Sequence, residues 1–259
     1  MEGKGRITGH TGLLALIGSP VGHSGSPAMY NYSFEKLGLD YAYVAFDIKV
    51  EEVKAALDAM RLFHMRGCNV TMPCKTEAAK YMDELSPAAR IIGAVNTIVN
   101  EDGKLIGHMT DGEGFVGNLR DHGIEIKGKK ITVAGGGGAA TAIQVQCALD
   151  GAREISIFNI KDDFFERTLE TAEKIRKEVP GIVVNVYDIA DTAKMTEEIQ
   201  SSDIFANATI VGMKPMDDQS VVKDLSAFRP GLVVADAVYN PEETKLLREA
   251  KEAGCTCIG

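Results

Sequence analysis

The chain has 259 residues, enough for one large or two ordinary domains, and its 45% hydrophobic and 25% charged residues are typical of a globular protein. A formal net charge of −9 provides no electrostatic basis for nucleic-acid binding. Near the N-terminus the apolar run Leu13–Gly18 is too short for a signal-peptide core or a membrane span, so neither is expected.

In the first half, short apolar runs alternate with helical stretches, which predicts an α/β architecture with parallel sheets. The pattern predicts strands over Gly12–Ile17, Tyr41–Phe46, Gly67–Met72, Ala94–Val99 and Lys104–Met109. The last two strands flank Asp102-Gly103, a hairpin turn signal. Helices are expected over Pro27–Lys36, capped by Ser26, over Val50–Phe63, and from Pro73 onward.

The second half repeats the alternation after a helix that starts near Asp111 and connects the two halves. The predicted strands are Lys130–Ala134, Ile155–Phe158, Ile182–Val186, Ile204–Ala206, Leu232–Ala235 and Cys255–Ile258. Helices are expected over Ala139–Leu149 and from about Asp163 to Glu178, the latter burying Phe165, Leu169, Ala172 and Val179. We therefore expect two α/β domains, residues 1–111 and residues 112–259.

A run of four glycines separates the first strand of the second half from the following helix, within Ala134–Ala139. Glycine permits positive φ and lets a phosphate approach the backbone, and the helix N-terminus adds a partial positive charge. This context indicates a dinucleotide site in a Rossmann-type domain, with Gly135, Gly137, Gly138 and Ala139 as candidate ligands of the diphosphate. A tight turn without a ligand is the alternative interpretation of the motif alone.

The end of the next strand, Phe158–Asp163, is where the adenosine ribose is expected. A carboxylate there accepts hydrogen bonds from the ribose and repels a 2′-phosphate, whereas an arginine binds that phosphate. Ile160 stands where such an arginine would be useful, and Asp162 follows, so we expect NAD to be favoured over NADP, with Asn159 and Asp162 at the cofactor. Asp162 also suits a helix N-cap, and Lys161 could tolerate a phosphate.

Three segments of the first half carry polar groups that a plain core would avoid: residues 23–27, residues 69–75, and residues 94–97 together with 110–112. Each lies at the carboxyl end of a predicted strand, the edge where open α/β sheets bind ligands. The three segments therefore predict a ligand site in the first domain.

Most of these polar residues also have ordinary structural roles. Ser26 and Asp111 are suitable helix caps, and Lys75 alone would be a solvated helix lysine. The asparagines and threonines could form turns. His23 and His108 are best interpreted as loop residues. Only the joint pattern favours a functional site.

Five motifs, taken in order, resemble successive motifs of the shikimate dehydrogenase family: Ser24-Gly25-Ser26-Pro27, Asn69-Val70-Thr71-x-Pro73-x-Lys75, Gly93-Ala94-Val95-Asn96-Thr97, Thr110-Asp111-Gly112 and Gly135-x-Gly137-Gly138-Ala139. Two further matches are Asn207-Ala208-Thr209 with Gly212-Met213, and Tyr239-Asn240-Pro241. The motifs span most of the chain. The stretch Phe158–Phe165 is similar to that of the shikimate/quinate branch, which accepts NAD and a second substrate.

This resemblance implies an NAD(P)-dependent oxidoreductase of the shikimate pathway of aromatic amino acid biosynthesis. It would interconvert shikimate and 3-dehydroshikimate, or quinate and 3-dehydroquinate. The N-terminal domain would bind the substrate and carry the catalytic pair, Lys75 and Asp111. Such a pair suits removal of a hydroxyl proton as the hydride leaves: a neutral lysine takes the proton, or a charged lysine polarises the carbonyl.

The remaining site residues follow from the same resemblance. The substrate-binding positions are Ser24, Ser26, Asn69, Thr71, Asn96 and Tyr239. The second domain would add Thr209 and Met213 to the cofactor site.

The chain departs from the family pattern at two places. Met109 stands where the family has an asparagine, so an amide that could order this loop is lost. The family also continues past Ile258-Gly259 into a glycine-rich turn and helices that fold back on the first domain and supply a substrate-binding glutamine. If the protein ends here, we expect weakened catalysis and an exposed apolar surface.

Two other functions remain open on the sequence: turnover of a different ring acid, and a non-catalytic module that senses a ring acid or nucleotide. Retention of both Lys75 and Asp111 argues against a sensor. The expected partner is a small ring acid, without nucleic acid or membrane, and a homodimer is the candidate oligomer. Five cysteines without metal-ligand spacing predict no metal site and a reducing, cytoplasmic compartment.

Overall fold

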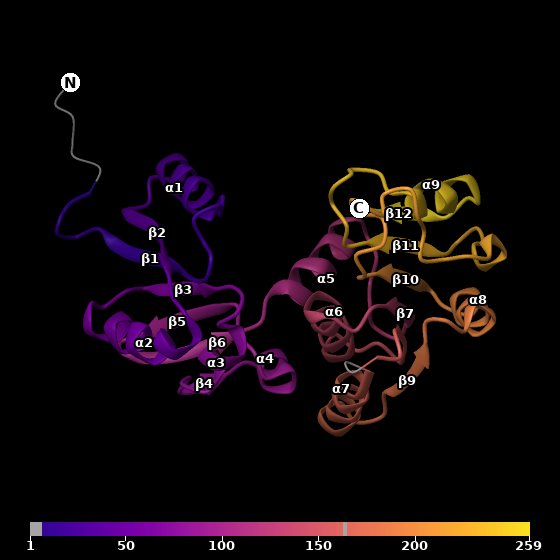
Figure 1. The fold of residues 1–259 in the computed structure, drawn as a ribbon, viewed down its shortest axis with the longest axis horizontal. Helices are drawn as coiled ribbons and strands as arrows, with labels where there is room; N and C mark the ends of the chain where they lie inside the picture. Colours follow the sequence, from indigo (N-terminus) through magenta and orange to yellow (C-terminus); the bar gives the residue numbers. More distant parts are fainter. Residues whose placement is uncertain (1–6, 163–164) are drawn as a thin grey trace. The chain divides into compact units, whose positions relative to one another are not determined.

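The computed structural model describes residues 7–162 and 165–259. The chain forms two compact units, Met1–Thr110 and Asp111–Gly259 (Figure 1). The division falls one residue before the boundary placed from the sequence. None of the helices in the described ranges is long and apolar enough to cross a membrane.

The first unit contains a mostly parallel sheet in the order β2-β1-β3-β5-β6-β4. Its strands are β1 (Gly12–Gly18), β2 (Tyr41–Asp47), β3 (Gly67–Val70), β4 (Glu84–Leu85), β5 (Thr97–Glu101) and β6 (Lys104–His108). Its helices are α1 (Ser26–Leu37), η1 (Val50–Glu52), α2 (Val53–Leu62), α3 (Lys75–Ala79) and α4 (Pro87–Ile92). Only β5 runs against its neighbours, so the carboxyl ends of β1, β3 and β6 share one edge with the start of β5.

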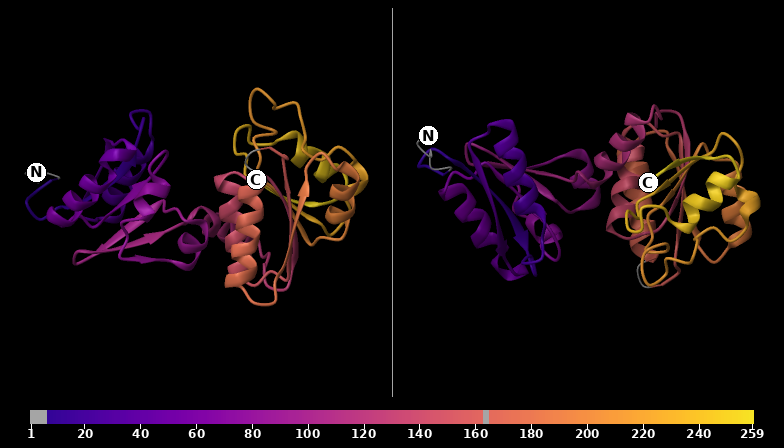
Figure 2. Two further views of the ribbon diagram at one scale, coloured as in Figure 1. Left: turned by 60° about the horizontal axis from the view of Figure 1, so that its bottom comes forward. Right: turned by 90° about the horizontal axis from the view of Figure 1, so that it is seen from above.

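Alternation along β1 distributes its side chains between two layers. Leu16 packs with Phe34 of α1 and Tyr43 of β2 on one face. On the other face, Ile17 lies opposite Leu57 of α2. Figures 1 and 2 show α1 and α2 on opposite sides of this sheet.

The second unit contains a parallel sheet in the order β12-β11-β10-β7-β8-β9. Its strands are β7 (Lys130–Ala134), β8 (Glu154–Asn159), β9 (Val183–Asp188), β10 (Ile204–Asn207), β11 (Val233–Asp236) and β12 (Thr256–Ile258). Its helices are α5 (Asp111–Asp121), α6 (Gly138–Leu149), α7 (Phe165–Glu178), α8 (Thr192–Gln200), η2 (Leu225–Ala227) and α9 (Lys245–Glu252). The strand order reverses between β7 and β10, the topological switch point where such sheets bind ligands.

Helices cover both faces of the second sheet: α5, α6 and α7 lie on one side, and α8 and α9 on the other (Figures 1 and 2). Phe158 and Phe205 are fully buried and join one apolar cluster with residues of α8 and α9. The two-layer coverage explains why β7 is buried along its whole length.

The predicted α/β fold with mostly parallel sheets is confirmed, and most elements lie within a few residues of their expected positions. The predicted turn Asp102-Gly103 joins β5 and β6, with both residues at positive φ. Two details differ from the expectation. β5 begins at Thr97 rather than Ala94, and α3 begins at Lys75 rather than Pro73. Asp163, the expected start of α7, lies outside the described residues.

Candidate active site

In the first unit, polar side chains gather at the shared edge of β1, β3, β5 and β6. Ser24 lies in the loop after β1, Thr71 follows β3, and Asn96 directly precedes β5. Asn96 therefore reaches this edge from the start of an antiparallel strand, and not from a carboxyl end as the sequence suggested. The expected polar edge of the sheet is present, but β1, β3 and β6 end there whereas β5 begins there.

A cavity of about 330 Å³ opens beside the loop after β1, and Ser24, Ser26 and Thr71 all line it. Ser26 is the first residue of α1 and not its cap, since the cap position is Gly25 and makes no side-chain hydrogen bond. The Ser24 hydroxyl accepts a hydrogen bond from the backbone N–H of Ser26 (3.2 Å). His23, set aside in the sequence analysis, lines the same cavity.

A chain of hydrogen bonds runs along the same edge through Asn69, Asn96 and Thr110. Oδ1 of Asn96 accepts from the backbone N–H of Thr110 (3.0 Å) and from its hydroxyl (3.2 Å). Nδ2 of Asn69 donates to the Thr97 hydroxyl (3.1 Å), which lies 3.4 Å from that of Thr110. The polar residues of this edge are therefore ordered by one another.

The two proposed catalytic residues each begin a helix. Lys75 opens α3, and its backbone carbonyl accepts from Val95 N–H (3.0 Å), which ties it to the segment that carries Asn96. Asp111 opens α5 in the second unit with an exposed side chain, directly after Thr110 in the chain. Tyr239, which follows β11 in the second unit, is 87% exposed.

In the second unit, the glycine turn follows β7 and leads into α6. Gly135 has φ of 121°, and a side chain there would meet the backbone oxygen of Ala208 at 2.7 Å. A side chain at Gly136 would strike Asn159 and the Thr168 hydroxyl, the latter at 2.5 Å. In contrast, a Cβ on Gly137 or Gly138 would meet open space. The turn thus packs tightly on one side and presents bare backbone on the other, which is the shape that suits a diphosphate.

A cavity of about 540 Å³ lies against this turn, at the carboxyl ends of β7, β8, β9 and β10. Of the cofactor residues expected from the sequence, Gly135, Gly137, Asn159 and Thr209 line it. Gly138, Ala139, Asp162 and Met213 are not among its lining residues. Gly138 opens α6, and Met213 lies in the loop that also carries Thr209.

Sequence reasoning missed several lining residues in the loops after β9 and β10. Ile189 and Ala190 come from the first loop, and Ile210 and Val211 from the second. The signal that could have found them is topological: in a parallel sheet, every loop that follows a strand near the switch point shares one edge. Ile160, the position considered for cofactor choice, also lines the cavity and is 59% exposed.

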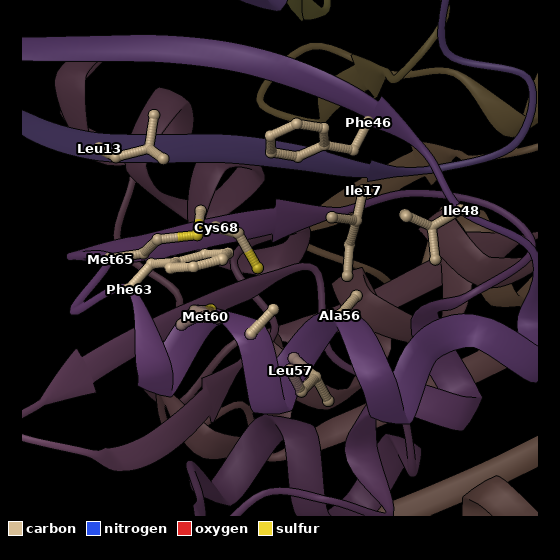
Figure 3. A pocket seen from close by; sticks show the side chains of 11 residues that line it. Leu13, Ile17, Phe46, Ile48, Ala56, Leu57, Met60, Phe63, Met65 and Cys68 are labelled. Atoms are coloured by element: carbon tan, nitrogen blue, oxygen red, sulfur yellow. The ribbon is translucent and has the colours of Figure 1, made fainter.

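A third cavity, of about 300 Å³, lies between α2 and the sheet of the first unit. Figure 3 shows only apolar side chains pointing into it, including Leu13, Ile17, Phe46 and Met60. It offers no polar group to orient a hydroxylated acid, so it is not a candidate for the ring-acid site. Within residues 7–162 and 165–259, no cluster of His, Cys, Asp or Glu could hold a metal ion.

Known proteins resemble this chain over most of its length. The family model of the shikimate dehydrogenase substrate binding domain matches residues 16–98. A shikimate dehydrogenase (NADP(+)) of Listeria monocytogenes is 50% identical over 98% of this chain and 87% of its own length.

Solved structures resemble the fold of this chain as well. The crystal structure of shikimate 5-dehydrogenase from Listeria monocytogenes, in complex with shikimate and NAD, has a TM-score of 0.94 at 50% identity, covering 98% of this chain and 87% of that one. Quinate dehydrogenase from Corynebacterium glutamicum, in complex with NAD, has a TM-score of 0.82 at 28% identity, covering 96% and 87%. The chain belongs to the shikimate dehydrogenase family.

Proposed function

We propose that this protein is an oxidoreductase that interconverts shikimate and 3-dehydroshikimate with a nicotinamide dinucleotide, and that quinate and 3-dehydroquinate form a second substrate pair. The observation that carries the proposal is the polar sheet edge of the first unit: Ser24 and Thr71 line one cavity there, and Val95, the residue before Asn96, donates to the backbone carbonyl of Lys75. The relatives are named as dehydrogenases, which favours an enzyme over a non-catalytic sensor.

We assign substrate binding to the first unit, Met1–Thr110, and NAD(P) binding to the second unit, Asp111–Gly259. The match of residues 16–98 to a substrate-binding domain supports the first assignment. The glycine turn and its cavity at the switch point support the second.

The hydroxyls of Ser24, Ser26 and Thr71 would bind the substrate from their shared cavity. Neutral hydroxyls can both donate to a carboxylate and accept from ring hydroxyls, so they suit a polyhydroxylated acid. Asn69, Asn96 and Tyr239 complete the proposed substrate set. Holding the ring by several hydrogen bonds limits it to one orientation, which favours reaction at a single carbon.

Lys75 and Asp111 would manage the proton of the reacting hydroxyl. Lys75 stands at the start of α3, where its backbone is tied to the Asn96 segment. Asp111 follows Thr110, whose backbone and hydroxyl bind Asn96. Each residue is therefore linked through the chain to the polar edge, and a lysine with a carboxylate can take up or release a hydroxyl proton.

The bound nicotinamide ring would accept or supply the hydride. Backbone N–H groups of Gly137, Gly138 and Ala139 would hold the diphosphate at the start of α6, which with its 12 residues contributes a positive dipole end. Asn159 and Asp162 would bind the adenosine ribose, and Thr209 and Met213 would flank the cofactor further along. We propose NAD as the preferred cofactor, because Ile160 lines the cavity where an arginine would be needed to bind a 2′-phosphate.

A reducing, cytoplasmic setting suits the five cysteines, all of which are free thiols.

A Lys75→Ala variant tests the activity against the sensor alternative. We expect oxidation of shikimate to fall by about 1000-fold or more, while the dissociation constant for NAD⁺ stays within about twofold. Lys80→Ala is the matched control, because Lys80 is exposed at the end of α3 and pairs with Glu77. Undiminished turnover in Lys75→Ala would contradict the proposed role.

A further inference from the structure

A tyrosine outside the family motifs contacts the proposed substrate site from β2. Tyr43 is 4% exposed, and its hydroxyl donates to Oδ1 of Asn69 at 2.8 Å. Its ring stacks on Tyr30 of α1, with centroids 4.5 Å apart and planes 15° from parallel. A buried tyrosine whose hydroxyl reaches a single polar side chain serves that side chain as well as the core.

The partners of Asn69 determine which way its amide faces. Nδ2 donates to the Thr97 hydroxyl at 3.1 Å and lies 3.4 Å from the backbone oxygen of Asn96, which can only accept. Oδ1 must therefore face Tyr43, and the tyrosine hydroxyl must be the donor. Burial, with the nearby Tyr30, raises the pKa of Tyr43, so this hydroxyl keeps its proton.

The backbone of Tyr43 is held in turn by Asn31 of α1. Its N–H donates to Oδ1 of Asn31 at 3.0 Å, and its carbonyl accepts from Nδ2 at 2.7 Å. β2 is the end strand of the described sheet, so the Asn31 amide takes the place of a neighbouring strand at this point. Nδ2 also donates to the carbonyl of Pro27 at 2.7 Å, in the first turn of α1.

These bonds form a continuous path from Pro27 through Asn31, Tyr43 and Asn69 to Thr97. One end holds the start of α1, where Ser26 lines the polar cavity, and the other holds the start of β5. The path joins two parts of the substrate edge that lie far apart in sequence. Without the tyrosine hydroxyl, Oδ1 of Asn69 loses its donor, and the amide is held from one side only.

We propose that Tyr43 is a positioning residue for the ring-acid reaction, orienting the Asn69 amide toward the bound substrate, with Asn31 holding Tyr43 in place. The proposal rests on the proposed function, since it gives Asn69 a role at the substrate. Nδ2 of Asn69 is occupied by its two protein partners, so the contact left for a substrate hydroxyl is the second lone pair of Oδ1. Tyr43 acts through Asn69 and does not touch the substrate itself.

The test is a double-mutant cycle on the full chain, with steady-state oxidation of shikimate by NAD⁺. Tyr43→Phe should raise KM for shikimate roughly 3- to 10-fold, the effect of one hydrogen bond, with kcat and KM for NAD⁺ within about twofold. In an Asn69→Ala background, the same change should alter KM less than twofold, because its target is gone. Tyr41→Phe is the control: Tyr41 lies two residues earlier on the same face of β2 and packs on Phe34.

The outcomes separate the two proposals. An unchanged KM in Tyr43→Phe, or an equal rise in KM with and without Asn69, would overturn the positioning role while wild-type turnover upholds the proposed function. No turnover of any ring acid by the wild type would overturn the proposed function and the positioning role together.

Discussion

Nδ2 of Asn207 donates a 2.9 Å hydrogen bond to Oδ1 of Asp236, and both side chains are buried where β10 and β11 end side by side. Oδ1 of Asn207 accepts from the backbone N–H and the hydroxyl of Thr209, at 3.1 and 2.8 Å. Asp236 also accepts from the Thr244 hydroxyl at 2.7 Å. Burial raises the pKa of Asp236, and its hydrogen bonds offset this only in part. The pair thus holds the loop that carries Thr209 to the cofactor cavity.

Asn207→Ala should therefore weaken NAD⁺ binding without touching the substrate edge of the first unit. It removes both bonds to Thr209 and leaves Asp236 with one buried donor fewer, so we expect about 2 kcal/mol of destabilisation and roughly tenfold weaker binding. Isothermal titration with NAD⁺ and thermal unfolding measure the two effects. Thr209→Ser keeps the hydroxyl and should bind like the wild type. Wild-type affinity in Asn207→Ala would show that the loop does not depend on this pair.

Two neighbouring glycines should respond differently to alanine. Gly136→Ala places a methyl group against Asn159 and Thr168, whose side chains share a buried 3.0 Å hydrogen bond, so it should lower stability by about 1–3 kcal/mol even without cofactor. Gly137→Ala meets open space and should keep the wild-type melting temperature while raising the Kd for NAD⁺ several-fold. Unaltered NAD⁺ affinity in Gly137→Ala would place the diphosphate elsewhere.

Cofactor choice is expected to depend on Ile160, which is 59% exposed and lines the cavity after β8. Ile160→Arg would supply a guanidinium for a 2′-phosphate, so the ratio of kcat/KM for NADP⁺ over NAD⁺ should rise by about 10- to 100-fold. Ile160→Gln is the uncharged control and should leave the ratio within about threefold. A ratio unaffected by arginine would mean that the ribose lies away from this strand end.

Acid stability should depend on Glu198, whose side chain is 6% exposed on α8. Burial alone would raise its pKa, but hydrogen bonds from Lys130 (2.7 Å), Lys194 (2.8 Å) and Ser156 (2.7 Å) outweigh burial and lower the pKa to about 2. Because the folded pKa lies below the ordinary value of 4.5, the carboxylate stabilises the fold above pH 4.5 and loses this effect as the pH falls toward 2. The shift corresponds to roughly 3 kcal/mol.

Glu198→Gln should therefore have a melting temperature well below that of the wild type at pH 7. The difference between the two melting temperatures should shrink as the pH falls from 4.5 to 2. Glu197→Gln is the matched control, since Glu197 is 70% exposed and its ion pair with Lys194 (3.1 Å) lies at the surface, where such pairs contribute little to stability. A gap of constant size across the acid range would contradict the lowered pKa.

Much of this fold could be predicted because its signals are local. The bounds of β7, Lys130–Ala134, match the expectation, because its apolar residues Ile131, Val133 and Ala134 end directly at the glycine turn. Helix α7 shows where such signals fail: Leu169 was expected inside but is 36% exposed, whereas Thr168 and Ile175 are buried. Thr168 faces inward because its hydroxyl accepts from Asn159, a partner that periodicity cannot reveal.

Part of the candidate site could be predicted from the sequence in the same way, and part of it could not. The motifs indicated Ser24, Thr71 and the glycine turn, because hydroxyl groups or glycines after a strand stand out from the apolar runs around them. Tyr43 was missed because an aromatic residue in a strand is typical of any core. Its link to Asn69 depends on two strands that only the folded sheet brings near each other, with β1 between them.

Absorbance of the reduced nicotinamide, followed while the wild-type chain is offered shikimate or quinate with NAD⁺ or NADP⁺, tests the central claim most directly. The account predicts turnover of shikimate, slower or comparable turnover of quinate, and higher kcat/KM with NAD⁺ than with NADP⁺. Absence of turnover in all four combinations, from a folded chain that binds NAD⁺, would contradict the assignment of this chain as a ring-acid dehydrogenase.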